Sequence, residues 1–242
     1  MSALRKMKSL RAFIIGDLHG CSAELDVLLN EISATPDDTV VCLGDYIDRG
    51  PDARGVVERL LALERSGCRC VFLKGNHEDM FLDYLGQRGH FGDAFLFNGG
   101  ESTLNSYGLQ GRKGIGAWEA LPAEHRAFFG ALQLTFRWGD FLCVHAGFDP
   151  RRSLDQQHEE DMLWIRQEWI HATHDFGCTV VFGHTPMREP FLHWPYKIGI
   201  DTGLVYGNAL TCLVVPEMRF LQVRRNGRAV TSWEPRQKLP VR

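Results

Sequence analysis

The sequence predicts an α/β fold in which two β-sheets pack face to face, as a sandwich, and helices flank them. In the first 85 residues, three apolar, β-branched runs alternate with amphipathic segments, which is typical of β-α-β units. Beyond residue 134, short strand-like runs bounded by Gly, Pro, Asn and Asp replace that pattern. The chain has 242 residues, 44% of them hydrophobic, so we expect one domain, 1–242, with a full core.

The first half of the chain is expected to form a parallel sheet. Apolar runs predict strands at 10–15, 39–43 and 68–73. Helices are expected to begin at Ser22, which can cap the first of them, at Pro51 and at His77. Right-handed crossovers then bring the carboxyl ends of the strands to one edge of the sheet, where open α/β sheets bind their ligands.

The second half is expected to contain an insertion and a second sheet. The segment at about 87–132 is rich in glycine and aromatic residues and predicts a helical and looped insertion that shapes a substrate site. A hairpin is expected at 134–145, a helix at 155–171, and strands of the second sheet at 179–182, 197–200, 209–215 and 220–224. The tail from Trp233 to Arg242 is expected to fray.

Five polar fragments follow predicted strands and carry the residues that predict a metal site. They are Gly16-Asp17-Leu18-His19-Gly20, Gly44-Asp45-Tyr46-Ile47-Asp48-Arg49-Gly50, Gly75-Asn76-His77-Glu78, His145-Ala146-Gly147 and Gly183-His184-Thr185. We expect one ion on Asp17, His19 and Asp45, and a second on Asp45, Asn76, His145 and His184. Any one fragment alone could be an ordinary turn or a core histidine, so the prediction depends on their joint occurrence.

His77 is expected to act as a general acid. It follows Asn76 directly, so it would lie beside the metals without binding them. Asp48 can pair with it and keep it protonated near neutral pH. The alternative is that Asp48 only forms a salt bridge with Arg49. Asp201 is expected either to orient a ligand histidine or to cap a turn.

The ordered set of fragments resembles the PPP family of phosphoprotein phosphatases, and in particular its bacterial and bacteriophage lambda-type members. The resemblance spans about 14–207, and Asp48-Arg49-Gly50 is its most specific element. Gly183-His184-Thr185-Pro186 lacks the second histidine of nuclease-like relatives, which favours the phosphatase branch. The resemblance implies a calcineurin-like metallophosphoesterase fold and two divalent ions, most often Mn²⁺ with Fe or Zn as alternatives. It also implies direct attack by a metal-bridging hydroxide.

The same resemblance implies a phosphate-binding set of Arg49, Arg166 and Asn76. Guanidinium groups match phosphate oxygens and stabilise charge that develops on them. Without the resemblance, Arg166 would be interpreted as a solvated arginine on an amphipathic helix.

The expected activity is hydrolysis of phosphomonoesters, with phosphoserine and phosphothreonine in proteins as the leading substrates. The rival resembles the symmetrical diadenosine tetraphosphate hydrolases, with capped RNA as a further candidate substrate. The segment 87–132 has both basic and aromatic side chains and does not discriminate between the two. A binding module without activity is disfavoured because every expected ligand and acid is present.

Bulk properties bound the partners and the compartment. The net charge of -3 gives no reason to expect stable nucleic-acid binding, so a phosphoprotein or phosphorylated small molecule is the expected partner. Seven scattered cysteines without zinc-site spacing fit a reducing cytoplasm. No apolar stretch follows the basic start, Met1 to Lys8, and none approaches the roughly 18 residues of a membrane span. We therefore expect a cytoplasmic protein without a membrane partner.

Overall fold

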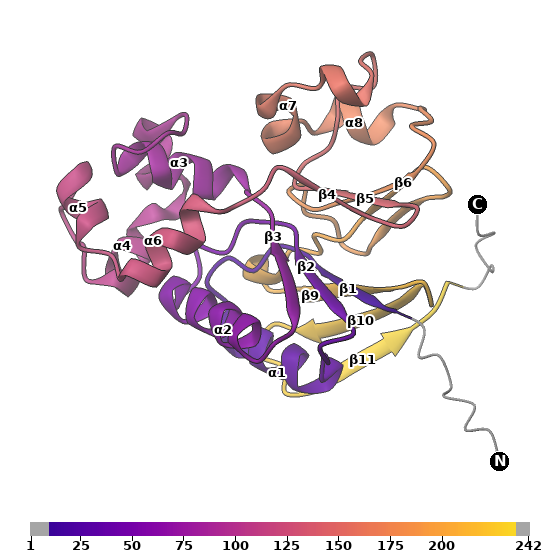
Figure 1. The fold of residues 1–242 in the computed structure, drawn as a ribbon, viewed down its shortest axis with the longest axis horizontal. Helices are drawn as coiled ribbons and strands as arrows, with labels where there is room; N and C mark the ends of the chain where they lie inside the picture. The colour runs from indigo at the N-terminus through magenta and orange to yellow at the C-terminus, as the bar shows by residue number, and fades with distance from the viewer. Residues whose placement is uncertain (1–9, 236–242) are drawn as a thin grey trace.

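The computed structural model describes residues 10–235, whose centre is two mixed β-sheets (Figure 1). Within these residues the first sheet has the strand order β11-β10-β9-β1-β2-β3 and the second has the order β4-β5-β6-β8-β7. Helices α1 and α2 cover the outer side of the first sheet, and α7 and α8 lie beside the second (Figure 1). The predicted two-sheet α/β architecture is confirmed.

The first part of the chain folds as the sequence predicts. Its elements are β1 (Ala12–Ile15), α1 (Ser22–Ile32), β2 (Thr39–Cys42), α2 (Ala53–Arg65), β3 (Arg69–Phe72) and α3 (Asn76–Tyr84). The three strands pair in parallel. Along β1, Phe13 and Ile15 pack under the helices, whereas Ala12 and Ile14 face the second sheet, as the two-residue repeat of a strand requires.

The first helix begins at Ser22, as predicted, but Ser22 does not cap it. The Ser22 hydroxyl instead donates to Asp52 at 2.6 Å. Asp52 in turn caps α2 by accepting a hydrogen bond from the backbone N–H of Gly55 at 2.9 Å. The second helix therefore begins after Asp52 and not at Pro51, because the aspartate offers the N-cap oxygen that proline lacks.

The insertion is helical and looped, as expected. It contains η1 (Gly92–Ala94), η2 (Leu96–Gly100), α4 (Glu101–Tyr107), α5 (Ile115–Glu119) and α6 (Ala123–Gly130). Phe95 and Phe129 of the insertion pack against Phe81 of α3, with ring centroids 5.3 and 5.2 Å away. These aromatic side chains join the insertion to the core of the first sheet.

The final strands correct the predicted sheet assignment. The second sheet contains β4 (Thr135–Trp138), β5 (Phe141–Val144), β6 (Thr179–Phe182), β7 (Phe191–His193) and β8 (Lys197–Gly199). The strands β9 (Ala209–Val215) and β10 (Arg219–Arg224) were expected there, but they extend the first sheet, with β9 antiparallel to β1. All seven residues of β9 are buried, so this strand needs cover on both faces. Its place in the first sheet provides this, with helices on one face and the second sheet on the other.

The last strand among the described residues is one that the sequence did not predict. Residues Val230–Trp233 form β11, and the Trp233 ring stacks on Phe220 at a centroid distance of 4.4 Å. The expectation of fraying is therefore wrong at Trp233. The rest of that expectation, at 236–242, lies outside the described residues, as do Met1 to Lys8.

The helix expected at 155–171 is broken into three pieces. They are η3 (Leu154–Gln156), α7 (Glu159–Trp164) and α8 (Gln167–His171). Arg166 lies between α7 and α8, so its interpretation as a residue within one amphipathic helix is wrong. The carbonyl of Met162 accepts the Ala146 N–H at 2.8 Å and that of Trp164 contacts His184 at 3.2 Å. These carbonyls are thereby committed to neighbouring loops where a longer helix would use them internally.

Among the described residues, no helix combines the length and the apolar character that crossing a bilayer would require. All seven cysteines fall within 10–235, and none of them forms a disulfide there.

Candidate functional site

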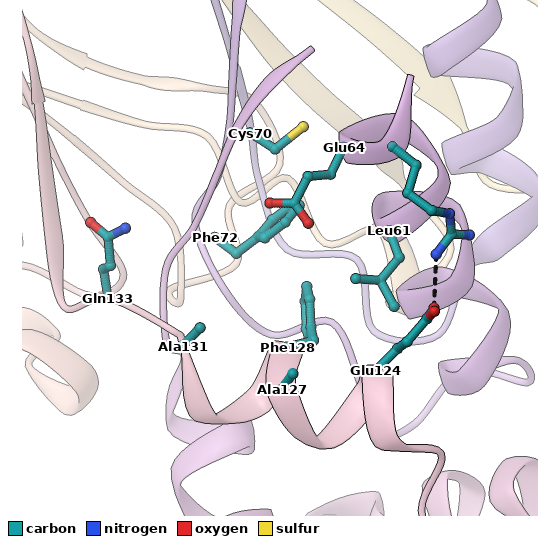
Figure 2. A pocket seen from close by; sticks show the side chains of 10 residues that line it. Leu61, Glu64, Cys70, Phe72, Glu124, Ala127, Phe128, Ala131 and Gln133 are labelled. Atoms are coloured by element: carbon teal, nitrogen blue, oxygen red, sulfur yellow. Dashed lines mark hydrogen bonds and ion pairs between the residues drawn. The ribbon is translucent and has the colours of Figure 1, made fainter. Parts of the chain in front are cut away.

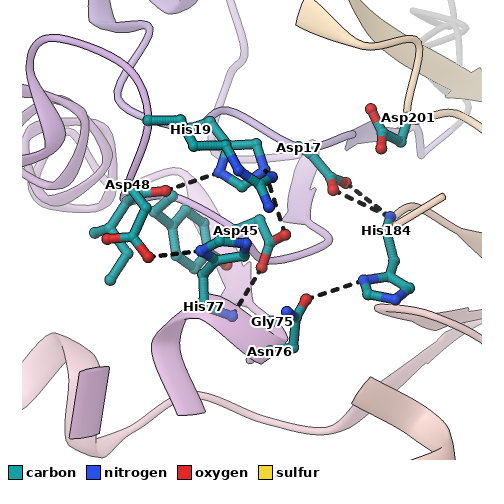
Figure 3. A network of polar contacts seen from close by, with 12 residues as sticks. Asp17, His19, Asp45, Asp48, Gly75, Asn76, His77, His184 and Asp201 are labelled. Carbon is teal, nitrogen blue, oxygen red and sulfur yellow. Dashed lines mark hydrogen bonds and ion pairs between the residues drawn. The ribbon is translucent and has the colours of Figure 1, made fainter. Parts of the chain in front are cut away.

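The five polar fragments meet at one place, where loops from both sheets converge. Figure 3 labels residues of all of them except the fragment that begins at His145. Asp17 and His19 follow β1, Asp45 and Asp48 follow β2, Asn76 and His77 begin α3, and His145 and His184 follow β5 and β6. None of these eight side chains belongs to a residue that is more than 4% exposed. The structure thus brings together residues that are up to 167 positions apart in the sequence.

One group of possible metal donors consists of His19, Asp45 and His77, whose ligand atoms all lie within 4.8 Å of one another. His19 Nε2 is 3.5 Å from Asp45 Oδ2. The other ring nitrogen, Nδ1, is 2.8 Å from the backbone carbonyl of Ile47. Donation to that carbonyl fixes the ring and leaves Nε2 with the lone pair that a metal requires.

A second group consists of Asp45, His145 and His184, again within 4.8 Å. His145 Nε2 is 3.5 Å from Asp45 Oδ1, and the Leu43 carbonyl holds its Nδ1 at 2.9 Å. The Asn76 amide oxygen is 3.1 Å from His145 Nε2 and 2.9 Å from His184 Nδ1. The two oxygens of Asp45 therefore face different histidine groups, which is the arrangement expected of a bridging carboxylate.

Asp17, also expected as a ligand, belongs to neither group. Its carboxylate instead accepts the His184 backbone N–H, at 3.2 and 3.0 Å from the two oxygens (Figure 3). Burial raises the pKa of Asp17 well above its usual value, and the charges of Asp201 and Asp45 raise it further. A cation bound beside Asp17 would relieve this repulsion.

The electrostatic state of these groups fits a pair of divalent cations. Burial lowers the pKa of His19 to about 3 and also lowers the pKa values of His145 and His184. These rings are therefore neutral and can donate lone pairs. Neutral imidazoles, carboxylates and an amide oxygen suit Mn, Fe or Zn.

His77 and Asp48 form a buried pair next to this cluster. His77 Nδ1 is 2.6 Å from Asp48 Oδ2. The hydroxyl of Thr103 donates to Asp48 Oδ1 at 2.5 Å and accepts the Asp48 backbone N–H at 2.9 Å. Asp48 therefore contacts His77, as the sequence predicts. It also contacts Thr103, which sequence reasoning missed. The alternative partner, Arg49, has its Nη1 2.6 Å from His19 Nε2 instead.

Glu78 is a second residue that sequence reasoning did not place. Its carboxylate accepts backbone N–H groups from Asp45 at 2.8 Å, Tyr46 at 2.8 Å and Gly75 at 2.9 Å. It therefore fixes the loop that carries Asp45 against the start of α3. The sequence offered one indication of this role, because Glu78 ends the Gly75-Asn76-His77-Glu78 fragment.

The backbone around the site adopts conformations that are rare outside functional loops. Left-handed φ angles between 41° and 70° occur at His19, Asp45, Asp48, Arg49 and His184. Gly44 has φ +110°, and a Cβ there would lie 2.6 Å from the Gly75 nitrogen and 2.9 Å from His145 Nδ1. The glycine therefore permits the close approach of three site loops.

The two arginines expected at the site both lie beside it. The backbone N–H of Arg49 donates to the Gly99 carbonyl at 3.1 Å, and its guanidinium lies 5.5 Å from the Tyr206 ring centroid. Burial lowers the pKa values of His145 and His184, and the charge of Arg166 adds to this effect. Arg166 is thus near the second donor group, although it is exposed to solvent.

Asp201 caps a turn, one of its two expected roles. Its Oδ1 accepts the Gly203 backbone N–H at 2.9 Å, and burial raises its pKa to about 6.

A cavity of about 410 Å³ lies elsewhere, between α2, β3 and α6 (Figure 2). It is lined mainly by apolar side chains such as Leu61, Phe72 and Phe128, with an Arg65–Glu124 ion pair at 2.9 Å. None of the candidate site residues lines it.

The fold and the cluster of possible metal donors agree with the match to a family model. The chain belongs to the calcineurin-like phosphoesterases, whose model matches residues 10–210. It is similar to the serine/threonine-protein phosphatase 1 of Salmonella typhimurium, with 32% identity over 82% of this chain and 89% of that protein.

Other relatives act on a different substrate. The asymmetrical bis(5'-nucleosyl)-tetraphosphatase PrpE of Halalkalibacterium halodurans is 28% identical over 87% of this chain and 92% of its own length. The crystal structure of a proposed diadenosine tetraphosphatase aligns with a TM-score of 0.65 and 28% identity, covering 88% of this chain and 93% of that one. The expected family and fold are confirmed, and the protein is a phosphoesterase. These dinucleoside relatives include an asymmetrical enzyme, whereas the sequence suggested the symmetrical type.

Proposed function

We propose that this phosphoesterase is a phosphatase with two divalent ions that removes phosphate from phosphoserine and phosphothreonine in proteins. The buried His77–Asp48 pair, 2.6 Å apart beside Asp45, carries this proposal. Serine and threonine leave as poorly stabilised alkoxides, so their departure needs a positioned proton donor. A nucleotide leaving group is already a stable phosphate anion and needs such a donor far less. The similarity to a serine/threonine phosphatase supports the same substrate.

The proposed metal set is the one expected from the sequence, with Mn²⁺ as the native ion. Asp17, His19 and Asp45 would hold one ion; Asp45, Asn76, His145 and His184 would hold the other. When bound, these ions supply activation of the attacking water and positive charge for the phosphate oxygens.

The chain's own residues account for the remaining steps. Arg49 and Arg166 would bind and orient the phosphate oxygens, with the Asn76 amide as a further donor. His77 would transfer the proton on its other ring nitrogen, Nε2, to the leaving oxygen, because Nδ1 is held by Asp48. Thr103 keeps Asp48 in place for this transfer.

A side-by-side comparison of substrates tests the proposal. With manganese added, kcat/KM is measured for phosphoserine and phosphothreonine peptides and for diadenosine tetraphosphate. We expect the peptides to be preferred by at least about tenfold, a difference of roughly 1.4 kcal/mol in transition-state stabilisation. A preference for the dinucleotide would overturn the assigned substrate but leave the phosphoesterase family intact.

One observation favours dinucleoside tetraphosphate hydrolysis as a second candidate. Phe97, on η2, is 94% exposed, and the carbonyl of Gly99 in the same helix accepts the Arg49 backbone N–H. Tyr206 is 62% exposed and lies beside the Arg49 guanidinium. Exposed aromatic rings next to a phosphate-binding arginine could stack nucleobases. Under this candidate, Phe97→Ala would raise KM for diadenosine tetraphosphate and leave KM for a phosphopeptide unchanged. Equal effects on both substrates would contradict it.

A further inference from the structure

Lys197 is a fully buried lysine on β8, outside the cluster of candidate metal donors. Its ammonium group donates to the backbone carbonyls of Trp169 and Ala172, the latter at 2.8 Å. It also lies 4.6 Å from the Trp169 ring centroid, where a cation–π interaction is favourable. Burial lowers the pKa of Lys197 to about 8. Because burying an ammonium group costs free energy, these specific contacts call for an explanation.

The carbonyls that Lys197 binds are at the C-terminal end of α8. A cation is favourable there because the last carbonyls of a helix are unpaired and carry partial negative charge. The opposite end of this short helix begins at Arg166, whose carbonyl accepts the N–H groups of Trp169 at 3.1 Å and Ile170 at 2.9 Å. Lys197 thus fixes one end of a single helical turn, and Arg166 lies at the other.

Trp169 connects the same turn to a loop that carries a candidate ligand. It is fully buried and packs on Gly147, where an added Cβ would lie 2.5 Å from the indole Cγ. Gly147 is two residues from His145. On the preceding segment, the Trp164 carbonyl is 3.2 Å from His184 Nε2. The path from Lys197 to Arg166 is therefore held against the loops of both histidines.

We infer that Lys197 is a positioning residue that sets the place of the Arg166 guanidinium through α8 and Trp169. The inference rests on the proposed role of Arg166 in binding phosphate, but it does not depend on whether the substrate is a phosphoprotein or a dinucleotide. Lys197 does not touch the phosphate in this account. It determines how well the exposed Arg166 side chain is directed toward the donor cluster.

A double-mutant cycle tests the inference on the manganese-loaded enzyme. The readouts are KM and kcat for an aryl phosphate monoester and the inhibition constant of inorganic phosphate, with melting temperatures recorded for each variant. Lys197→Met keeps the length of the side chain and removes its charge. We expect it to raise KM and the phosphate inhibition constant about tenfold, with a much smaller change in kcat, because ground-state phosphate binding weakens. In an Arg166→Ala background, the same change should have no further effect.

The control is Lys113→Met, which removes an exposed lysine paired with Asp93 and should leave both constants unchanged. Trp169→Phe provides a second route if Lys197→Met does not fold, and its effect should also vanish in Arg166→Ala. Equal effects of Lys197→Met with and without Arg166, or no effect on phosphate inhibition, would overturn the inference. If Arg166→Ala itself left phosphate inhibition unchanged, the proposed role of Arg166 in binding phosphate would be wrong. The inference about Lys197 would then be wrong as well.

Discussion

His77 is held on two sides, and these contacts define its chemistry. Its Nδ1 faces Asp48, and its backbone N–H donates to Asp45 Oδ1 at 3.2 Å. His77 also lies among the donor atoms within 4.8 Å around Asp45, so geometry alone permits it to be a ligand. Its ring nitrogen facing Asp48 is committed to that carboxylate. Its role as an acid and its role as a ligand therefore make different predictions for the same substitution.

Replacing His77 with Asn should slow turnover without loss of bound metal. We expect kcat for phosphoserine to fall by roughly 10²- to 10⁴-fold, the usual contribution of a positioned acid. The loss should be much smaller for an aryl phosphate whose leaving group needs no proton. The measurements are metal content and kcat on both substrates. His125→Asn, which alters a buried histidine bonded to Tyr107 at 2.7 Å, is the control. Loss of metal from the His77 variant would identify a ligand instead of an acid.

At the residue scale, the sequence indicated the polar cluster but not its supports. Asp48 and His77 were found because each belongs to a fragment that follows a strand. Thr103 contacts Asp48 across 55 positions, and nothing in its surrounding sequence indicates that contact. The local sequence predicts that Lys197 is an ordinary strand residue, although its side chain is fully buried. Such supporting roles depend on tertiary neighbours, which local patterns do not specify.

Between elements, the loop after β2 packs so tightly that a single methyl group should disrupt it. Gly44→Ala places a Cβ 2.6 Å from the Gly75 nitrogen in a left-handed conformation, so we expect both stability and activity to fall. Gly67→Ala is the matched control, because Gly67 has φ +89° but nothing within 4 Å of an added Cβ. It should cost only about 1 kcal/mol, the conformational part of the effect. Urea unfolding and kcat/KM measure the two parts, and equal losses in both variants would contradict the packing argument.

The turn before β2 should make stability depend on pH. Asp38 is buried, which opposes ionisation, but two hydrogen bonds from Arg11 at 2.9 Å and those from Thr35 outweigh this and lower its pKa. A lowered folded-state pKa stabilises the protein above the unfolded value of about 3.9, and this contribution disappears as the pH falls through the folded value.

Asp38→Asn should therefore lower the unfolding free energy at pH 7 by about 1–3 kcal/mol, the usual effect of losing buried charged hydrogen bonds. The difference from the natural chain should shrink steadily below about pH 4. Asp93→Asn, at a side chain that is 98% exposed, serves as the control. A difference that stays constant down to pH 2 would show that Asp38 is not the titrating group.

At the element scale, predictions held where partners are near in sequence. The parallel strands β1, β2 and β3 are joined by single helices, so their order follows from local patterns. The placement of β9 failed because its partner β1 lies almost 200 residues earlier. The predicted helix at 155–171 failed because its carbonyls are used by the loops of Ala146 and His184. Hydrophobic periodicity alone does not reveal such competition.

Across the whole molecule, the two sheets share the candidate metal site. Asp17, Asp45 and Asn76 come from the first sheet, and His145 and His184 from the second. Metal bound there would contact both sheets and would be released on unfolding. Manganese should therefore raise the melting temperature, and a chelator should reverse the rise.

The expected rise is about 10–20 °C, since each of the two sites at a hundredfold excess over Kd contributes about 2.7 kcal/mol. Asp45→Asn should abolish most of this rise because both donor groups share Asp45. Asp93→Asn should preserve it. A full manganese-dependent rise in the Asp45 variant would exclude Asp45 as the shared ligand.

The pairing of β1 with β9 has a consequence for synthesis on the ribosome. β1 is complete at residue 15, but its antiparallel neighbour spans Ala209–Val215 and is the last of the strands whose residues are all buried. Until β9 is made, the edge of β1 that pairs with it has no hydrogen-bonding partner. The apolar side chains of β1 also lack their β9 neighbours on that side. A nascent chain that pauses before residue 209 therefore displays an open strand edge to other chains and to chaperones. The first strand made is thus completed by one of the last.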